Sequence, residues 1–171
     1  MEKVNVKIRK GTNEDLDAIY ECHKQCFEQS DQWYKTMIAQ NLNSSYIIII
    51  KDEIVGIMLE GDIKSCDLSE VDDFVPLNEE GILFKKNNFH IENLYGITML
   101  CILPKYRSKG LASKLIEIHF KENKDKPFLC LNTRKSNKAI NLYLKMGYNK
   151  IAEIKNKYFF PNENSCFMIK K

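Results

Sequence analysis

The first hydrophobic pattern along the chain predicts a strand followed by a helix. Residues 4–8 alternate apolar and polar side chains, which is the period of a half-buried strand. Thr12 or Asn13 can then cap a helix, because both side chains accept hydrogen bonds from the first helical amides. The apolar positions at helical spacing are Leu16, Ile19, Tyr20, His23 and Phe27.

A second helix and a hairpin are expected next. The helix should run from residue 31 to residue 42. Two stretches rich in β-branched residues, 46–50 and 54–59, flank the polar residues 51–53 and therefore predict a β-hairpin. The order up to this point is strand, helix, helix, strand, strand.

The second half of the chain predicts alternating strands and helices. Pro104 cannot donate to a sheet ladder and marks the end of a strongly apolar strand. Gly147 suits the position just after a helix. The expected elements are a strand over 94–103, a helix from 108 into the charged stretch 121–126, a strand over 128–131, a helix from Ser136 through Met146, and strands over 151–155 and 166–169.

The segment 62–93 has no regular pattern, so no element is predicted within it. A connection of this length is usually functional or without regular structure, and we treat it as a candidate substrate loop. Its acidic side chains would attract a small cationic amine by electrostatic steering. These residues are Asp62, Asp67, Glu70, Asp72, Asp73, Glu79 and Glu80.

Length and composition are those of one ordinary globular domain, 1–171. The chain has 171 residues, of which 44% are hydrophobic and 29% charged. No apolar run is long enough to span a membrane, and the N-terminus does not resemble a signal peptide. The net charge of +3 is spread over many lysines, so neither nucleic acid nor membrane is an expected partner.

The six cysteines show no tight pairing pattern, which favours free thiols in a reducing compartment, the cytoplasm. Cys22 and Cys26 lie four residues apart with His23 between them, so a metal site can be imagined there. No second ligand pair at suitable spacing is apparent. Buried thiols are the favoured interpretation, and no metal is expected.

The most informative segment is 100–112, which reads as a strand, a turn and the start of a helix. The first amides of a helix lack intrahelical acceptors, and the helix dipole adds partial positive charge there, so the segment predicts an anion site. Gly110 and Ala112 leave room for a phosphate, and Arg107 and Lys109 add cationic donors. The alternative is an ordinary strand-turn-helix with a solvated basic start.

Two motifs resemble the GCN5-related N-acetyltransferase (GNAT) superfamily. Arg107, Gly110 and Ala112 match its Arg/Gln-x-x-Gly-x-Gly/Ala signature, placed just after a strand. Residues 132–148 resemble its second block, Arg-x-Ser-Asn-x-x-Ala-x-x-x-Tyr-x-x-x-Gly-Phe/Tyr. The resemblance covers nearly the whole chain. It implies an α/β fold with a mixed, mostly antiparallel central sheet flanked by helices on both faces, and acetyl transfer from acetyl-CoA to an amine.

The resemblance also implies roles for particular residues. The amides from Ser108 through Lys109, Gly110 and Leu111 to Ala112 would hold the CoA pyrophosphate, and the backbone of Leu100, Cys101 and Ile102 would pair with the pantetheine arm. Asn137 would hydrogen-bond the pantetheine or phosphate region. Tyr143 would protonate the leaving thiolate, for which a phenol with a pKa near about 10 is suitable. A core tyrosine is the alternative for Tyr143.

The carboxylate base of the family is missing. Gly96 occupies the position where many relatives carry a Glu, and Asn132 stands where the ribosomal-protein alanine acetyltransferases carry theirs. Asn does not accept a proton at neutral pH. Ordered water, bulk solvent, Glu60 or Glu92 would then have to remove the proton of the amine.

The acceptor is expected to be a small-molecule amine, because of the acidic segment. The alternative is a protein N-terminus, since Tyr158, Phe159 and Phe160 resemble the aromatic residues with which N-terminal acetyltransferases hold a peptide. Ordinary strand packing would also explain these residues. Two non-catalytic alternatives are an inactive acyl-CoA sensor and an interaction protein. The retained Tyr143 and Gly110 favour an enzyme, as a monomer or homodimer.

Overall fold

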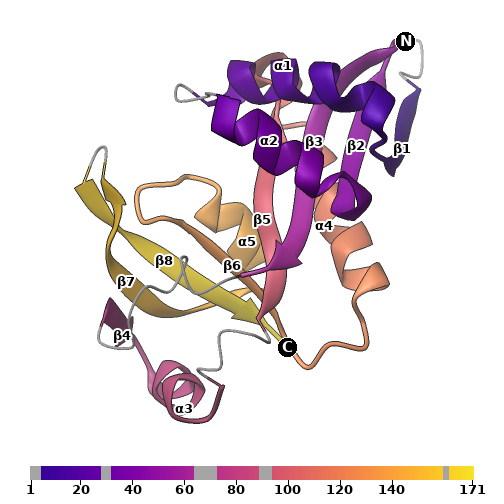
Figure 1. Cartoon of the computed structure of the whole chain (residues 1–171). Helices are drawn as coiled ribbons and strands as arrows, with labels where there is room; N and C mark the ends of the chain where they lie inside the picture. The colour runs from indigo at the N-terminus through magenta and orange to yellow at the C-terminus, as the bar shows by residue number, and fades with distance from the viewer. Residues whose placement is uncertain (1–4, 28–31, 64–72, 89–93, 160–161) are drawn as a thin grey trace. The chain divides into compact units, whose positions relative to one another are not determined.

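A computed structural model describes residues 5–27, 32–63, 73–88, 94–159 and 162–171. The chain forms two compact units. Unit 1 comprises residues 1–61 and 99–121, and unit 2 comprises residues 62–98 and 122–171. Strand β5 (Tyr95–Ile102) begins in unit 2 and ends in unit 1, and the two units are described separately below (Figure 1).

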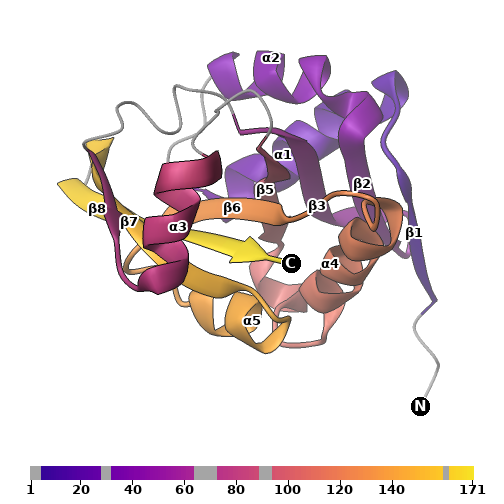
Figure 2. The ribbon, with the colours of Figure 1, turned by 90° about the horizontal axis from the view of Figure 1, so that it is seen from below.

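Unit 1 is a set of strands in the order β1-β2-β3-β5 with helices on both faces. Figure 2 shows α1 and α2 on one face of β2 and β3, and α4 on the opposite face. The predicted helices and strands of this part are therefore confirmed, with small shifts of their ends. The elements are β1 (Val6–Lys10), α1 (Leu16–Cys26), α2 (Gln32–Gln40), β2 (Ser45–Ile50), β3 (Glu53–Asp62) and α4 (Leu111–Glu122), with short 3-10 turns at Asn13–Asp15, Leu42–Ser44 and Pro104–Tyr106.

The expected hairpin is formed by β2 and β3, which pair antiparallel. Lys51 and Asp52, between the strands, have φ angles of 50° and 62°. Positive φ at both central residues is the geometry of the tight turns whose twist matches that of a hairpin. Strand β1 then pairs antiparallel with β2, with Ile8 opposite Ile48.

Unit 2 contains strands in the order β5-β6-β8-β7-β4. The pairing of β5 with β6 is parallel and that of β6 with β8, β8 with β7, and β7 with β4 is antiparallel. The mixed, mostly antiparallel sheet expected from the sequence is thus confirmed. The elements are β4 (Phe74–Pro76), α3 (Glu79–Asn88), β6 (Leu129–Arg134), α5 (Ile140–Lys145), β7 (Asn149–Phe159) and β8 (Asn162–Lys170).

The core of unit 2 contains a cluster of three aromatic rings, those of Phe74, Phe84 and Phe167, among aliphatic side chains. The rings of Phe74 and Phe84 stack with their centroids 5.9 Å apart, and each ring lies 5.5 Å from the ring of Phe167. All three side chains are almost fully buried. Burial of a phenylalanine contributes about 1.5–3 kcal/mol, so this cluster is a major stabilising element of the unit.

Helix α3 and strand β4 lie in the segment where the sequence predicted no element. Ile82 and Leu83 are each 57% exposed, whereas the next residue, Phe84, is buried. The apolar residues of α3 therefore do not lie on one face, and the sequence lacks the periodicity that would have predicted a helix. The helix packs closely on β7. A Cβ atom at Gly81 would lie 2.0 Å from the Ile151 carbonyl oxygen, so only glycine permits this approach.

The last helix starts later than predicted, at Ile140 instead of Ser136. The Ser136 hydroxyl donates to Glu163 Oε1 at 3.0 Å and its amide donates to Glu163 Oε2 at 3.1 Å, so the side chain expected to cap the helix contacts β8 instead. Gly147 follows the helix with a φ of 92°, as expected for its C′ position. No helix in the described parts of the chain has the length and apolarity needed to cross a membrane.

Candidate functional site

The expected phosphate loop connects the end of β5 to α4 in unit 1. Ser108 and Gly110 have φ angles of 60° and 75°, so the chain turns through two left-handed residues before the helix begins at Leu111. The Lys114 amide donates to the Gly110 carbonyl at 3.2 Å. For the amides of residues 108–113, the described chain provides no backbone acceptor. These exposed donors at a helix N-terminus form an arrangement that can bind an anion.

The base of this loop is anchored to the β2–β3 hairpin through Glu53. Lys105 Nζ lies 2.9 Å from both carboxylate oxygens of Glu53, and the Tyr106 hydroxyl donates to Glu53 Oε2 at 3.1 Å. The Lys105 ammonium lowers the pKa of Glu53, which keeps the carboxylate charged. The contacts fix the start of the loop, while the Lys109 ammonium lies 5.3 Å from the Tyr106 ring and stays exposed.

Arg107 is turned toward the end of β5. Its Nε donates to the Ile102 carbonyl oxygen at 2.9 Å. The sequence pattern assigned Arg107 to the rim of the phosphate site. In the structure, the side chain links the loop to the strand that precedes it.

Strand β5 carries the residues expected to pair with pantetheine. Cys101 and Ile102 are buried and Leu100 is half-buried. The Leu103 amide donates to the Val55 carbonyl of β3 at 2.8 Å. In the described residues, the parallel register with β6 comprises Gly96 with Cys130 and Ile97 with Leu131, both before the expected pantetheine segment.

Asn137 shapes the turn before α5 in unit 2. Its Nδ2 donates to the Thr133 hydroxyl at 2.7 Å, and its Oδ1 accepts from the Ala139 amide at 2.9 Å. This local pattern is typical of asparagine in turns. The Asn137 side chain therefore stabilises this turn whether or not a ligand is bound.

Tyr143 lies on α5 and is 6% exposed. Its ring meets the ring of Tyr148 edge-on with the centroids 6.1 Å apart, and its carbonyl accepts from the Tyr148 amide at 3.0 Å. The main chain around the predicted acid is thus fixed by the turn after α5. The hydroxyl is attached to a side chain that packs like a core residue.

The space beside Gly96 is closed by the neighbouring strand. A Cβ atom at this position would lie 1.7 Å from the Cys130 carbonyl oxygen and 2.6 Å from its carbonyl carbon. Contacts this short with backbone cannot be relieved by rotating a side chain, so β5 and β6 in their present register accept only glycine here. A carboxylate at position 96 is incompatible with this pairing.

Asn132, at the second position of the missing carboxylate, lies on β6 opposite Phe167 of β8. Its Oδ1 atom is shielded from solvent and has no hydrogen-bond partner among the described residues. A buried carbonyl without a donor carries a free-energy cost of about 1–3 kcal/mol. An amine or a water molecule could supply that donor.

Of the two other carboxylates considered as bases from the sequence, the structure describes only Glu60. Glu60 is 5% exposed on β3, and its Oε1 lies 2.5 Å from Nδ1 of the fully buried His119 of α4. This buried pair within unit 1 is a feature that the sequence did not predict, because the residues lie far apart along the chain. Glu92 is outside the described residues.

The features expected to select the acceptor are only partly described. Tyr158 and Phe159 pair with Glu163 and Asn162 in the β7–β8 hairpin, and Phe160 lies outside the described residues. Of the acidic segment, the Glu80 carboxylate pairs with Lys171 at 2.7 Å. The residues Asp67, Glu70 and Asp72 also lie outside the described part.

Comparison with protein families gives a match over residues 43–150, more than half of the chain, to a model described as an acetyltransferase (GNAT) domain. The matched range contains the loop 107–112 and Tyr143. A comparison with curated proteins gives no match.

Solved structures share the fold at low sequence identity. The ribosomal-protein-S18-alanine N-acetyltransferase of Escherichia coli matches with a TM-score of 0.71 and 18% identity, covering 97% of this chain and 93% of that chain. Ard1 from Thermoplasma volcanium matches with a TM-score of 0.70 and 15% identity, over 98% and 97% of the two chains. NAA60 from Arabidopsis thaliana in complex with acetyl-CoA matches with a TM-score of 0.70 and 18% identity, over 96% and 98%.

Proposed function

The chain belongs to the GNAT acetyltransferase family, and on this premise we propose that residues 1–171 act as one domain that transfers an acetyl group from acetyl-CoA directly to a primary amine. The observation that carries the proposal is the loop before α4, with its left-handed Ser108 and Gly110 and its exposed amides. A pyrophosphate satisfies those donors and gains from the helix dipole. The short β5–β6 register leaves the backbone of Leu100 and the amide of Ile102 for the pantetheine arm, while the Ile102 carbonyl accepts from Arg107 Nε.

The transfer needs two proton movements. The amine nitrogen attacks the thioester carbonyl carbon, the C–S bond breaks, and the thiolate takes the phenolic proton of Tyr143. The proton lost by the amine then returns to the phenolate through water. In this scheme, Tyr143 is the general acid, and Asn137 orders the turn that precedes its helix while contributing to CoA binding.

Water is the proposed acceptor of the amine proton. The closed space at Gly96 and the Asn132 side chain leave both family positions without a base. Glu60 is held against His119 in the interior of unit 1, which makes it unsuited to contact an incoming amine. Asn132 Oδ1 can instead accept a hydrogen bond from the amine and so orient its lone pair.

The proposed acceptor is the α-amine of a peptide or protein N-terminus. Support comes from similar structures whose names state such substrates, including the ribosomal-protein-S18-alanine enzyme and an Arabidopsis thaliana Naa50 complex with the bisubstrate analogue CoA-Ac-MVNAL. A small cationic amine is the second candidate, favoured by the acidic residues of the segment 62–93. Five described cysteines are free, which agrees with a reducing, cytoplasmic setting.

A thiol-release assay with acetyl-CoA tests the proposal. The acceptor panel holds short peptides with free N-termini, the same peptides with blocked N-termini and an internal lysine, and a set of polyamines and aminoglycosides. Mass spectrometry then locates the acetyl group. Turnover confined to free N-termini supports the peptide acceptor, turnover confined to polyamines supports the second candidate, and no turnover with any amine contradicts an acetyltransferase.

A further inference from the structure

Three cysteine side chains of unit 1 converge on one point. Cys22 and Cys26 lie on α1 and Cys101 lies on β5, and their three sulfur atoms all lie within 4.8 Å of one another. Cys22 is 2% and Cys101 6% exposed, while Cys26 is half-buried. The cluster therefore has two shielded sulfurs and one side that a small solute can reach.

We propose that Cys22, Cys26 and Cys101 bind a thiophilic d10 metal ion, Zn²⁺ or Cu⁺. Thiolates are the ligands that select these ions over harder cations. Three sulfurs bound to a tetrahedral ion at about 2.3 Å lie about 3.8 Å from one another. The longest distance between two sulfurs in the cluster therefore has to shorten by about 1 Å at most to reach this geometry. Rotation of the cysteine side chains provides such a movement.

The backbone already directs the sulfurs to one side of α1. Residues four apart in a helix lie on the same face, so Cys22 and Cys26 project together. Cys101 completes the set from a strand that follows far later in the chain, and this is why sequence spacing alone indicated only an isolated pair. The ring of His23 instead packs between Phe27 and Tyr34, with both centroids at 4.7 Å.

The surrounding charge also suits a metal thiolate. Binding Zn²⁺ to the three cysteines as thiolates gives a net charge of about −1. The guanidinium of Arg107 lies nearby, since its Nε donates to the carbonyl of Ile102, the residue that follows Cys101.

The site would join α1 to β5 at the start of the phosphate loop. Cys101 lies six residues before Arg107, and Arg107 Nε donates to the carbonyl of Ile102, which follows Cys101. A metal ion bound by folded but not by unfolded chain stabilises the fold by mass action. The expected role is structural, because the proposed acetyl transfer uses no metal.

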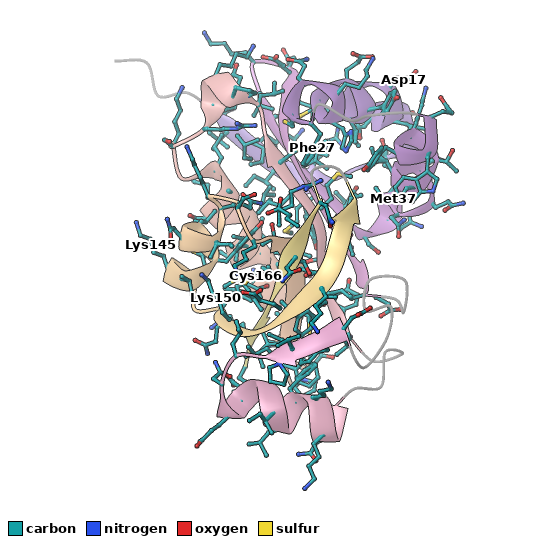
Figure 3. The ribbon with its side chains drawn as sticks, turned by 90° about the vertical axis from the view of Figure 1, so that its left-hand side faces the viewer. Asp17, Phe27, Met37, Lys145, Lys150 and Cys166 are labelled. Carbon is teal, nitrogen blue, oxygen red and sulfur yellow. The ribbon has the colours of Figure 1, made fainter. Side chains whose placement is uncertain are left out.

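The test measures binding of the metal alone to the full chain, fully reduced and prepared without an affinity tag that binds metal. Titration with Zn²⁺ against a chromogenic chelator and with Cu⁺ against a Cu⁺-specific chelator distinguishes the two ions. Cd²⁺ serves as a spectroscopic probe through its ultraviolet thiolate-to-metal charge-transfer band. The variants are Cys26→Ser, whose half-buried position tolerates the change, and Cys101→Ser. The matched control is Cys166→Ser on β8 of unit 2, labelled in Figure 3.

The proposal expects one ion per chain, a charge-transfer band and a raised melting temperature, each retained in Cys166→Ser. Removal of one of three sulfur ligands should weaken binding at least about 100-fold in Cys26→Ser. Equal binding by Cys26→Ser and the unchanged chain would overturn the site, even if Cys101→Ser fails to fold. Absence of binding by all three probe ions, or a disulfide within the cluster in place of binding, would overturn it as well.

Discussion

Tyr143 places a polar hydroxyl on a side chain that is otherwise packed as a core residue. The ring contacts Tyr148, and the backbone on either side is fixed by the hydrogen bonds of α5 and its terminating turn. Phenylalanine keeps the ring and removes the proton. A Tyr143→Phe substitution therefore distinguishes a catalytic role of the hydroxyl from a packing role of the ring.

We predict that Tyr143→Phe lowers kcat by about 10²–10⁴-fold, the usual contribution of a general acid. The affinity for CoA and the melting temperature should stay close to those of the unchanged chain, because little volume is lost. Steady-state kinetics and calorimetry with CoA measure the two effects. Activity retained within a few-fold would identify Tyr143 as a core residue and water as the acid.

The space around Gly110 is open, but its backbone conformation favours glycine. No atom lies within 4 Å of a Cβ built at this residue, whereas its φ of 75° disfavours side chains. Gly110→Val should therefore weaken CoA binding at least about tenfold, because the branched side chain occupies the space for the phosphates and strains the loop. Calorimetry with CoA measures the affinity.

The control for backbone strain is Gly147→Val, at a φ of 92° in unit 2. Both variants should lose about 1–3 kcal/mol of stability from the left-handed conformation. Only Gly110→Val should also lose CoA affinity beyond what its lowered stability explains. Normal CoA binding by folded Gly110→Val would show that the phosphates bind elsewhere.

At the scale of elements, the start of α1 is stabilised by one carboxylate. Arg9 donates to both oxygens of Asp15 at 2.6 and 2.8 Å, and the Thr12 amide donates to Asp15 at 2.8 Å. The hydrogen bond from Arg9, followed by those from Thr12, holds the pKa of Asp15 well below its usual range. The folded state therefore favours the ionised form.

Asp15→Asn should lower the free energy of unfolding at pH 7 by about 1 kcal/mol. Because the folded pKa lies below the unfolded one, the stabilisation by Asp15 is present above the unfolded value and is lost as the pH falls toward the folded value. The difference between the two proteins should thus shrink below about pH 5. Urea melts from pH 7 to pH 3 measure it. Asp17→Asn is the control, since the ion pair of Asp17 with Lys35 is exposed and should contribute little to stability (Figure 3). A pH-independent difference for Asp15→Asn would contradict the argument.

Local patterns in the sequence were enough to predict most strands and the loop before α4, because period and turn chemistry are local properties. Helix α3 was missed because Ile82 and Leu83 are exposed and its close contact through Gly81 depends on β7. The delayed start of α5 depends on Glu163, another distant residue. Sequence spacing likewise could not predict the third sulfur of the cysteine cluster or the buried Glu60–His119 pair, since each contact joins two elements that lie far apart in the sequence.

At the scale of the whole molecule, CoA should stabilise the folded state. A ligand at about 100 times its dissociation constant adds about 2.7 kcal/mol, which corresponds to a rise in melting temperature of about 5–10 °C for a chain of this size. Thermal melts with and without millimolar CoA measure the shift. Gly110→Val should show a much smaller rise, and an unchanged melting temperature together with no heat of binding would remove the proposed cosubstrate.

The Cys130 carbonyl beside Gly96 also limits which substitutions at position 96 can be accepted during evolution. A single nucleotide change converts each glycine codon into a glutamate or an aspartate codon, so a carboxylate at position 96 is one mutation away. The product of that change would have to separate β5 from β6, so the cost in stability would accompany any gain in catalysis. With this strand pairing, a carboxylate is easier to accommodate at position 132, because aspartate has nearly the same shape as the asparagine that already fits there.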